Sequence, residues 1–190
     1  MFLDRDGVLN RLVMNPATGD FESPHVVDDL EILPGVIPAL QRLQARGVSL
    51  FVISNQPSAA LGKTTIEKIA AIHARLDGEL QAAGIHIRHF YYCYHHPRGT
   101  VAPYAGPCDC RKPSPYFLHE AMREYRVRAE VSWMIGDRDV DVECGQRAGC
   151  RTILIECPES AGGRGNTAPS LVAADLPAAE RMLQTLWTPQ

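Results

Sequence analysis

Two aspartates one residue apart, Asp4 and Asp6, stand near the start of the chain in the stretch FLDRDGVLN, between two apolar runs. Two carboxylates this close resist joint ionisation, because each raises the energy of the other's charge. The pair therefore indicates a site that also holds a compensating cation. A D-x-D alone also occurs by chance or as a turn cap, so its weight depends on what the chain places beside it.

Further polar residues follow apolar runs that are typical of buried strands, or follow the loop after such a run. In an open parallel sheet, ligands bind beyond the carboxyl ends of the strands, so these groups should converge with the Asp4–Asp6 pair. Carboxylates, a hydroxyl and two cations suit a hard cation and a phosphate, because Mg²⁺ usually joins carboxylates to phosphate oxygens. The residues are Ser54, Asn55, Arg111, Lys112 and Asp137.

Three of the six cysteines lie beside histidines in one short stretch, in the pattern C-x-H-x12-C-x-C. Cys93, His95, Cys108 and Cys110 offer three thiolates and one imidazole, a set suited to closed tetrahedral zinc. His96 is an alternative to His95 that spacing alone does not exclude. The chain shows no secretion signal, which makes disulfides a poor account of these cysteines. A zinc ion here would brace the loop, residues 93–110, that leads into the next two cations.

The elements that must position these groups alternate between short apolar runs and helical patterns. This alternation predicts a three-layer, Rossmann-like α/β fold with a central parallel sheet and helices on both faces. The expected strands are 2–3, 48–54, 85–92, 131–136 and 151–156, and the expected helices are 34–46, 64–83, 116–125, 140–148 and about 176–187. Thr64 and Glu67 predict a capping box at the start of the second helix.

Two segments interrupt this order. Residues 96–115 form a loop rich in Pro, Gly and Cys, and a loop of that length is usually functional. Residues 161–170 indicate a flexible surface segment. No insertion is long enough for a separate cap domain, and nothing suggests a domain boundary, so residues 1–190 are expected to form one domain.

Composition narrows the class of function. Hydrophobic residues make up 45% of the 190 residues and charged residues 22%, as in an ordinary globular protein. The net charge of −3 argues against sequence-independent nucleic-acid binding, but it leaves small anionic substrates open. No apolar run approaches the length of a membrane span, so we expect a cytoplasmic protein without a membrane partner, and a monomer.

Four of these motifs occur in the order found in the haloacid dehalogenase superfamily of phosphohydrolases. The resemblance runs from about Phe2 to Glu156. It rests on D-R-D-G-V-L-N, the strand ending S-N-Q, the R-K-P and the G-D-x-x-x-D of residues 136–141. It implies that Asp4 is the nucleophile and Asp6 the acid and base. It also implies that Ser54, Asn55 and Lys112 bind the phosphoryl group.

The same resemblance implies a Mg²⁺ site formed by Asp4, Asp137 and the backbone carbonyl of Asp6. Asp141 and Arg138 would support that site, with Asp141 acting at one remove from the metal. A divalent cation suits this chemistry, because it neutralises both the carboxylate nucleophile and the anionic phosphate.

The cysteine loop resembles one subgroup more than others. Y-Y-C-x-H-H-P followed by C-D-C-R-K-P is similar to heptose 1,7-bisphosphate 7-phosphatases and to histidinol-phosphate phosphatases. The gap of 12 residues favours the heptose enzymes, where Arg111 would recognise the substrate beyond the reacting phosphate. Alternatives are a histidinol-phosphate phosphatase, another small sugar-phosphate phosphatase, or a catalytically silent zinc-stabilised binding module. The sequence leaves the exact sugar, its anomer and the phosphate position open.

Overall fold

The computed structural model describes residues 1–187. Its main sheet has six strands, all paired in parallel, in the order β5-β4-β1-β6-β7-β8. The strand order reverses direction around β1, so the polar residues that follow β1, β4 and β6 come out at one edge. The bounds are β1 Phe2–Leu3, β4 Leu50–Asn55, β5 Ile87–Cys93, β6 Trp133–Gly136, β7 Arg151–Ile155 and β8 Leu171–Ala173.

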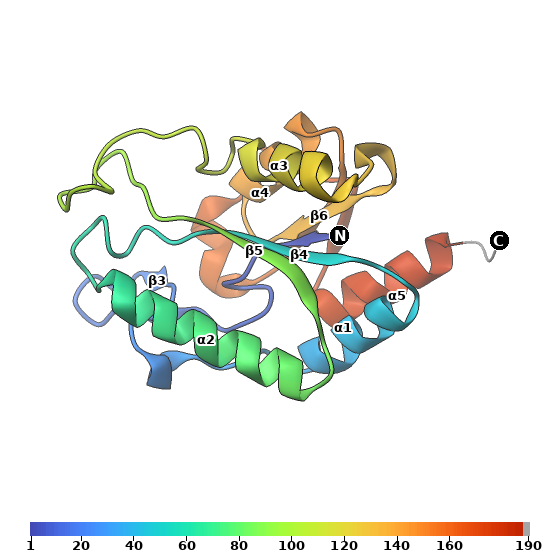
Figure 1. Cartoon of the computed structure of the whole chain (residues 1–190), viewed down its shortest axis with the longest axis horizontal. Helices are drawn as coiled ribbons and strands as arrows, with labels where there is room; N and C mark the ends of the chain where they lie inside the picture. The colour runs from blue at the N-terminus through green and yellow to red at the C-terminus, as the bar shows by residue number, and fades with distance from the viewer. Residues whose placement is uncertain (188–190) are drawn as a thin grey trace.

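Helices cover both faces of this sheet, as Figure 1 shows. Helices α3 (Tyr116–Tyr125) and α4 (Asp139–Arg147) lie on one face, and α1 (Val36–Ala45), α2 (Ile66–Ala82) and α5 (Leu176–Leu186) on the other. The three-layer α/β arrangement with a central parallel sheet is therefore confirmed.

Two buried apolar clusters correspond to the two faces. The larger cluster joins one face of the sheet to α1, α2 and α5, and includes Leu40, Leu76 and Leu183. The smaller joins the other face to α3 and α4 through Leu118 and Cys144. Burial on both faces explains why the central strands are continuous apolar runs rather than alternating ones.

Three sequence expectations need correction. The sheet has a sixth strand, β8, in a run of three apolar residues too short to separate from the surface segment before it. Residues 161–163, at the start of the expected flexible segment, belong to a 3-10 helix, Pro158–Gly163. The N-cap of α2 is Thr65, whose hydroxyl accepts from the Lys68 N–H, while Thr64 instead donates to the carbonyl of His25.

A short antiparallel hairpin was not foreseen. Strands β2 (Val13–Met14) and β3 (Phe21–Glu22) pair with each other between β1 and α1. The loop expected at residues 96–115 contains no helix or strand, and it begins two residues earlier, at 94. Together the hairpin and this loop border the carboxyl edge of the sheet. No helix among the described residues is long and apolar enough to cross a membrane.

Candidate active site and metal sites

A pocket of about 540 Å³ opens at the carboxyl ends of β1 and β4. The structure brings almost all of the predicted site residues to it. Those that line it are Asp4, Asp6, Ser54, Asn55, Arg111, Lys112, Arg138 and Asp141. Asp137 is almost fully buried, at 1% exposure, and is grouped with Asp4 and Asp141.

Gly7 lets the chain turn away from β1 so that both aspartates face the pocket. Its φ is +80°, a conformation that costs an L-residue free energy but not glycine. A Cβ at this position would also lie 2.4 Å from Oδ2 of Asp137. Glycine is therefore required both by the backbone and by the close approach of a carboxylate.

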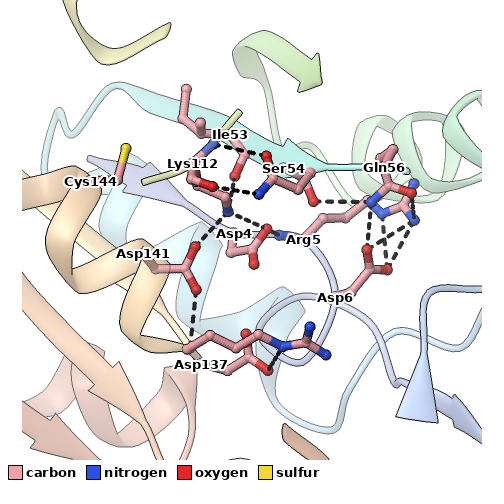
Figure 2. A network of polar contacts seen from close by, with 12 residues as sticks. Asp4, Arg5, Asp6, Ile53, Ser54, Gln56, Lys112, Asp137, Asp141 and Cys144 are labelled. Atoms are coloured by element: carbon pink, nitrogen blue, oxygen red, sulfur yellow. Dashed lines mark hydrogen bonds and ion pairs between the residues drawn. The ribbon is translucent and has the colours of Figure 1, made fainter. Parts of the chain in front are cut away.

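Lys112 is fully buried among oxygen acceptors. Its ammonium group contacts Asp4 Oδ1 at 2.9 Å and Asp141 Oδ1 at 2.6 Å, and it donates to the carbonyl of Ile53 at 2.7 Å (Figure 2). Burial opposes this charge, but Asp141 and Asp4 outweigh it and raise the pKa of Lys112. The residue therefore stays cationic although its side chain is buried.

The carboxylates of Asp4, Asp137 and Asp141 form a compact acidic group whose nearest oxygens lie within 4.8 Å of one another. Burial, followed by the negative charges of Asp141 and Asp4, raises the pKa of Asp137 to about 7. Burial is also the main cause that raises the pKa of Asp141 to about 6. Three buried carboxylates with one ammonium group leave an excess of negative charge.

Asp137 carries the clearest indication of a missing partner. Neither of its carboxylate oxygens accepts a hydrogen bond from the described residues, although both are buried. Arg138 Nε is 4.0 Å from Oδ2, too far for a hydrogen bond. Buried oxygens without donors are costly unless a cation is bound. The donor set therefore fits a divalent cation such as Mg²⁺. Asp141 is one of the three grouped carboxylates, whereas the sequence resemblance implied a position at one remove from the metal.

Asn55 acts on the backbone of Lys112. Its side-chain amide donates to the Lys112 carbonyl at 3.1 Å and accepts from the Lys112 N–H at 3.0 Å. The nitrogen and the oxygen of this amide thus both bond to the protein backbone, although the residue also lines the pocket. This contact fixes the long loop to the end of β4 and so places the ammonium group beside Asp4.

Three residues that surround Asp6 were not identified from sequence. Arg5, which is fully buried, donates from Nε and Nη2 to Asp6 Oδ1 at 3.1 and 3.0 Å. Gln56 Nε2 donates to Oδ2 at 2.5 Å, and Asn10 Nδ2 donates to Oδ1 at 2.9 Å. The motifs D-R-D-G-V-L-N and S-N-Q contain these residues, but neither their types nor their spacing indicates that they face Asp6.

The Cys/His group lies at the end of β5 and in the long loop. Sulfur atoms of Cys93 and Cys108 are 3.5 Å apart, as are those of Cys108 and Cys110, and Cys110 Sγ lies 3.9 Å from His95 Nδ1. The sulfur–sulfur distances are longer than a disulfide bond, so these cysteines are not cross-linked. The spacings match the edges of a tetrahedron with metal–sulfur bonds of about 2.3 Å.

The structure separates the two candidate histidines. His95 belongs to the group of four potential ligands, whereas His96 lines the pocket and accepts from the Arg98 N–H through Nδ1. The group is therefore compatible with a metal site made by Cys93, His95, Cys108 and Cys110.

Two further cations border the outer pocket. Arg111 and Arg138 both line it, and burial, followed more weakly by the charge of Arg138, lowers the pKa of Arg111. Lys63 also lines the pocket, but its ammonium group is 2.5 Å from Glu22 of the hairpin. Unlike Lys63, Arg111 and Arg138 have no carboxylate within 3.5 Å of their guanidinium groups among the described residues.

Comparison with known proteins agrees with this geometry. A family model described as HAD-hydrolase-like matches residues 109–179. A protein of Yersinia pestis named D-glycero-beta-D-manno-heptose-1,7-bisphosphate 7-phosphatase is 32% identical over 183 residues, which cover 94% of this chain and 93% of that protein. A Pasteurella multocida protein of the same name is 34% identical over 157 residues, 82% of this chain and 80% of its own length.

Solved structures give the same result. The D,D-heptose 1,7-bisphosphate phosphatase from B. bronchiseptica, crystallised with magnesium and phosphate, superposes with a TM-score of 0.80 at 26% identity, over 98% of both chains. A putative HAD-like phosphatase from Mesorhizobium loti shares the fold, with a TM-score of 0.78 at 24% identity over 100% of this chain and 87% of that one. Magnesium is typical of such phosphatases. The chain belongs to the haloacid dehalogenase-like phosphatases, in the family that contains the D-glycero-beta-D-manno-heptose-1,7-bisphosphate 7-phosphatases.

Proposed function

We propose that this protein removes the 7-phosphate of D-glycero-β-D-manno-heptose 1,7-bisphosphate, through a phosphoryl-enzyme intermediate on Asp4. The observation that carries the proposal is the juxtaposition of Asp4, Lys112 and Asp141 with the buried, unpartnered carboxylate of Asp137. The choice of substrate rests on relatives that are named as phosphatases of this heptose bisphosphate, one of which matches over 93% of its length. The whole chain, residues 1–190, would act as one domain.

Asp4 is set up to attack phosphorus. Its Oδ1 is held by the Arg5 N–H at 2.7 Å and by Lys112 at 2.9 Å, whereas the described residues donate no hydrogen bond to Oδ2. Anchoring one oxygen fixes the direction of the other, which is the geometry that an in-line displacement needs. In the first step an Asp4 oxygen bonds to phosphorus and the bond from phosphorus to the sugar oxygen breaks.

Asp6 would move the protons. It gives its proton to the departing sugar oxygen in the first step, so that an alcohol leaves rather than an alkoxide. In the second step it takes a proton from water as the water oxygen attacks phosphorus and the bond to Asp4 breaks. The products are the dephosphorylated sugar and inorganic phosphate, and both aspartates return to their starting states.

The remaining residues stabilise charge. Lys112 and the Ser54 hydroxyl would contact the transferring oxygens, and Asn55 would keep Lys112 in place. Asp4, Asp137 and the backbone carbonyl of Asp6 would hold Mg²⁺, supported by Asp141. When bound, the metal supplies positive charge to the nucleophile and the phosphate together.

The distal part of the substrate would bind at the outer pocket. Arg111 and Arg138 contribute two guanidinium groups to the pocket lining, and such groups suit a second anion. A bisphosphate has such an anion on the carbon skeleton that carries the reacting phosphate, whereas histidinol phosphate ends in an ammonium group. This difference favours a bisphosphate over histidinol phosphate.

The Cys/His group would bind structural zinc. All four donors are protein side chains, which leaves no open position for catalysis. The next two residues after Cys110 are Arg111 and Lys112, so the metal would fix the loop that carries both cations. We propose that it takes the place of a cap in shaping the pocket, and that the protein acts as a monomer.

A substrate panel tests the proposal. Phosphate release is measured with Mg²⁺ on heptose 1,7-bisphosphate, fructose 1,6-bisphosphate and histidinol phosphate, with Asp4→Asn as the inactive control. The proposal expects the heptose bisphosphate to give the largest kcat/KM and the Arg111→Met variant to lose that preference. A larger kcat/KM on histidinol phosphate would refute the substrate assignment, and equal release by Asp4→Asn would refute the mechanism.

A further inference from the structure

Arg5 is the largest fully buried side chain of the described residues, and it lies between the two aspartates of the D-R-D motif. A guanidinium group without access to water is costly unless its charge is paired and its N–H groups find acceptors. A large apolar side chain could fill the same volume at lower cost. An arginine in such a position therefore needs a specific reason in the site.

The contacts of Arg5 converge on one carboxylate. Nη2 donates to both oxygens of Asp6, at 3.0 and 3.1 Å, and Nε donates to Oδ1 at 3.1 Å. On the other side, the guanidinium carbon is 5.6 Å from the centre of the Tyr92 ring. Charge-assisted bonds of this bidentate kind fix orientation as well as position.

Gln56 completes the arrangement. It accepts from Arg5 Nη2 at 2.7 Å through Oε1, and it donates from Nε2 to Asp6 Oδ2 at 2.5 Å and to Ser54 Oγ at 3.0 Å. One amide thus ties the guanidinium group, the Asp6 carboxylate and a pocket hydroxyl into a single network, shown in Figure 2. Asn10 adds a further bond, from Nδ2 to Asp6 Oδ1 at 2.9 Å.

The network contacts both carboxylate oxygens of Asp6, and part of the side chain still faces the pocket. Asp6 lines the pocket with 10% of its side chain exposed, whereas Arg5 and Gln56 are fully buried and do not line it. Arg5 and Gln56 therefore cannot act on the substrate directly. Any effect of the Arg5 side chain must pass through the groups it contacts, chiefly Asp6, whereas Gln56 can act through Asp6 or through the Ser54 hydroxyl. An effect through Ser54 would slow both leaving groups alike, whereas an effect through Asp6 would depend on the leaving group.

We propose that Arg5 and Gln56 are positioning residues that hold the Asp6 carboxyl group toward the sugar–phosphate bridging oxygen. The inference rests on the proposed function, in which Asp6 gives a proton to that oxygen. Small errors in the placement of a proton donor have large effects on rate, because transfer needs a heavy-atom separation of about 3 Å. The arginine of D-R-D thus acts on the carboxylate that follows it.

Leaving-group dependence separates positioning from a structural role. An alcohol needs a proton as it leaves, but p-nitrophenolate leaves without one. The first-turnover rate, measured by rapid quench, isolates this step from the later attack of water. For Gln56→Leu and Arg5→Met we expect a fall of about 10- to 100-fold in first-turnover release of the sugar from heptose 1,7-bisphosphate. Release of p-nitrophenol from p-nitrophenyl phosphate should change less than about 3-fold on the same argument.

Three control variants separate loss of positioning from loss of charge and from loss of folding. Arg5→Lys keeps the charge and should recover part of the rate lost in Arg5→Met. Arg11→Met removes a nearby arginine that pairs with Glu31 at the surface, and it should leave the rates on both substrates unchanged. Thermal unfolding is followed for each variant, and Gln56→Leu decides the result if Arg5→Met does not fold, because it leaves the Arg5–Asp6 pair intact.

Equal slowing of both leaving groups in Gln56→Leu, or no slowing of either, would overturn the proposal. Failure of the proposed function has a different signature, since the unmodified protein would then release phosphate from neither compound, or Asp4→Asn would be as active as the parent. Activity on p-nitrophenyl phosphate and on ribose 5-phosphate but not on the heptose would refute only the substrate. The positioning test would then use ribose 5-phosphate.

Discussion

The acidic group around Asp137 makes a prediction about stability that does not depend on activity. In buffer without added divalent cation, Asp137→Asn should stabilise the folded protein at neutral pH. The asparagine has the shape of the carboxyl group without its charge, so it removes the repulsion from Asp4 and Asp141. Mg²⁺ should then stabilise the parent protein and leave the variant unchanged.

The magnitude follows from the pKa. Asp137 has a pKa of about 7 in the folded state against 3.8 as its ordinary value. Between these values the folded state holds a proton that the unfolded state has released, so the free energy of unfolding falls as pH rises from 3.8 to 7 and is level above. From pH 5 to 7 this is two pH units at about 1.4 kcal/mol each, or about 3 kcal/mol.

Urea unfolding at pH 5, 6, 7 and 8 measures this difference. The advantage of Asp137→Asn over the parent should grow by about 2 to 3 kcal/mol between pH 5 and 7, then level off. Asp139→Asn is the matched control. Its carboxylate accepts from Thr167 and Asn166, which lower its pKa, so its loss should destabilise the protein at neutral pH. A gap between parent and Asp137→Asn that is constant with pH would refute the reasoning.

Three other substitutions test neighbouring parts of the site. Gly7→Ala should destabilise the protein by about 1–3 kcal/mol and weaken Mg²⁺ binding, because of the φ of +80° and the collision with Asp137. Urea unfolding measures the stability and calorimetric titration measures the Mg²⁺ affinity, and an unchanged affinity would contradict this prediction. Asn55→Ala should lower kcat by about 10- to 100-fold with little change in KM, since it frees the Lys112 backbone; an unaltered kcat would show that the loop needs no such anchor. Cys108→Ser should remove bound zinc, detected by elemental analysis, and lower stability by at least about 2 kcal/mol; full zinc content in this variant would exclude the ligand assignment.

The sequence was sufficient for the residues that end strands. Asp4, Ser54 and Asp137 follow apolar runs, and the rule that ligands bind at the carboxyl edge of a parallel sheet brings them together without knowledge of packing. The C-x-H-x12-C-x-C spacing similarly predicted a group that the structure assembles. Only the structure could choose His95 over His96, because adjacent residues differ in direction rather than in spacing.

What the sequence did not reveal depends on contacts between distant residues. The side chains of Arg5 and Gln56 are 51 positions apart and meet only once β1 and β4 pair. The role of Asn55 in holding Lys112 could not be separated from a direct role in binding phosphate. The hairpin β2–β3 has two strands of two residues each, too short for a periodic pattern to show.

The central claim is that Asp4 carries the phosphoryl group between the two steps. The direct measurement is mass spectrometry of peptides from enzyme mixed with heptose 1,7-bisphosphate and quenched in acid within a single turnover. The account predicts a phosphoryl group on the peptide that contains Asp4, absent in Asp4→Asn together with phosphate release. A phosphoryl group on another residue, or undiminished phosphate release by Asp4→Asn, would contradict it.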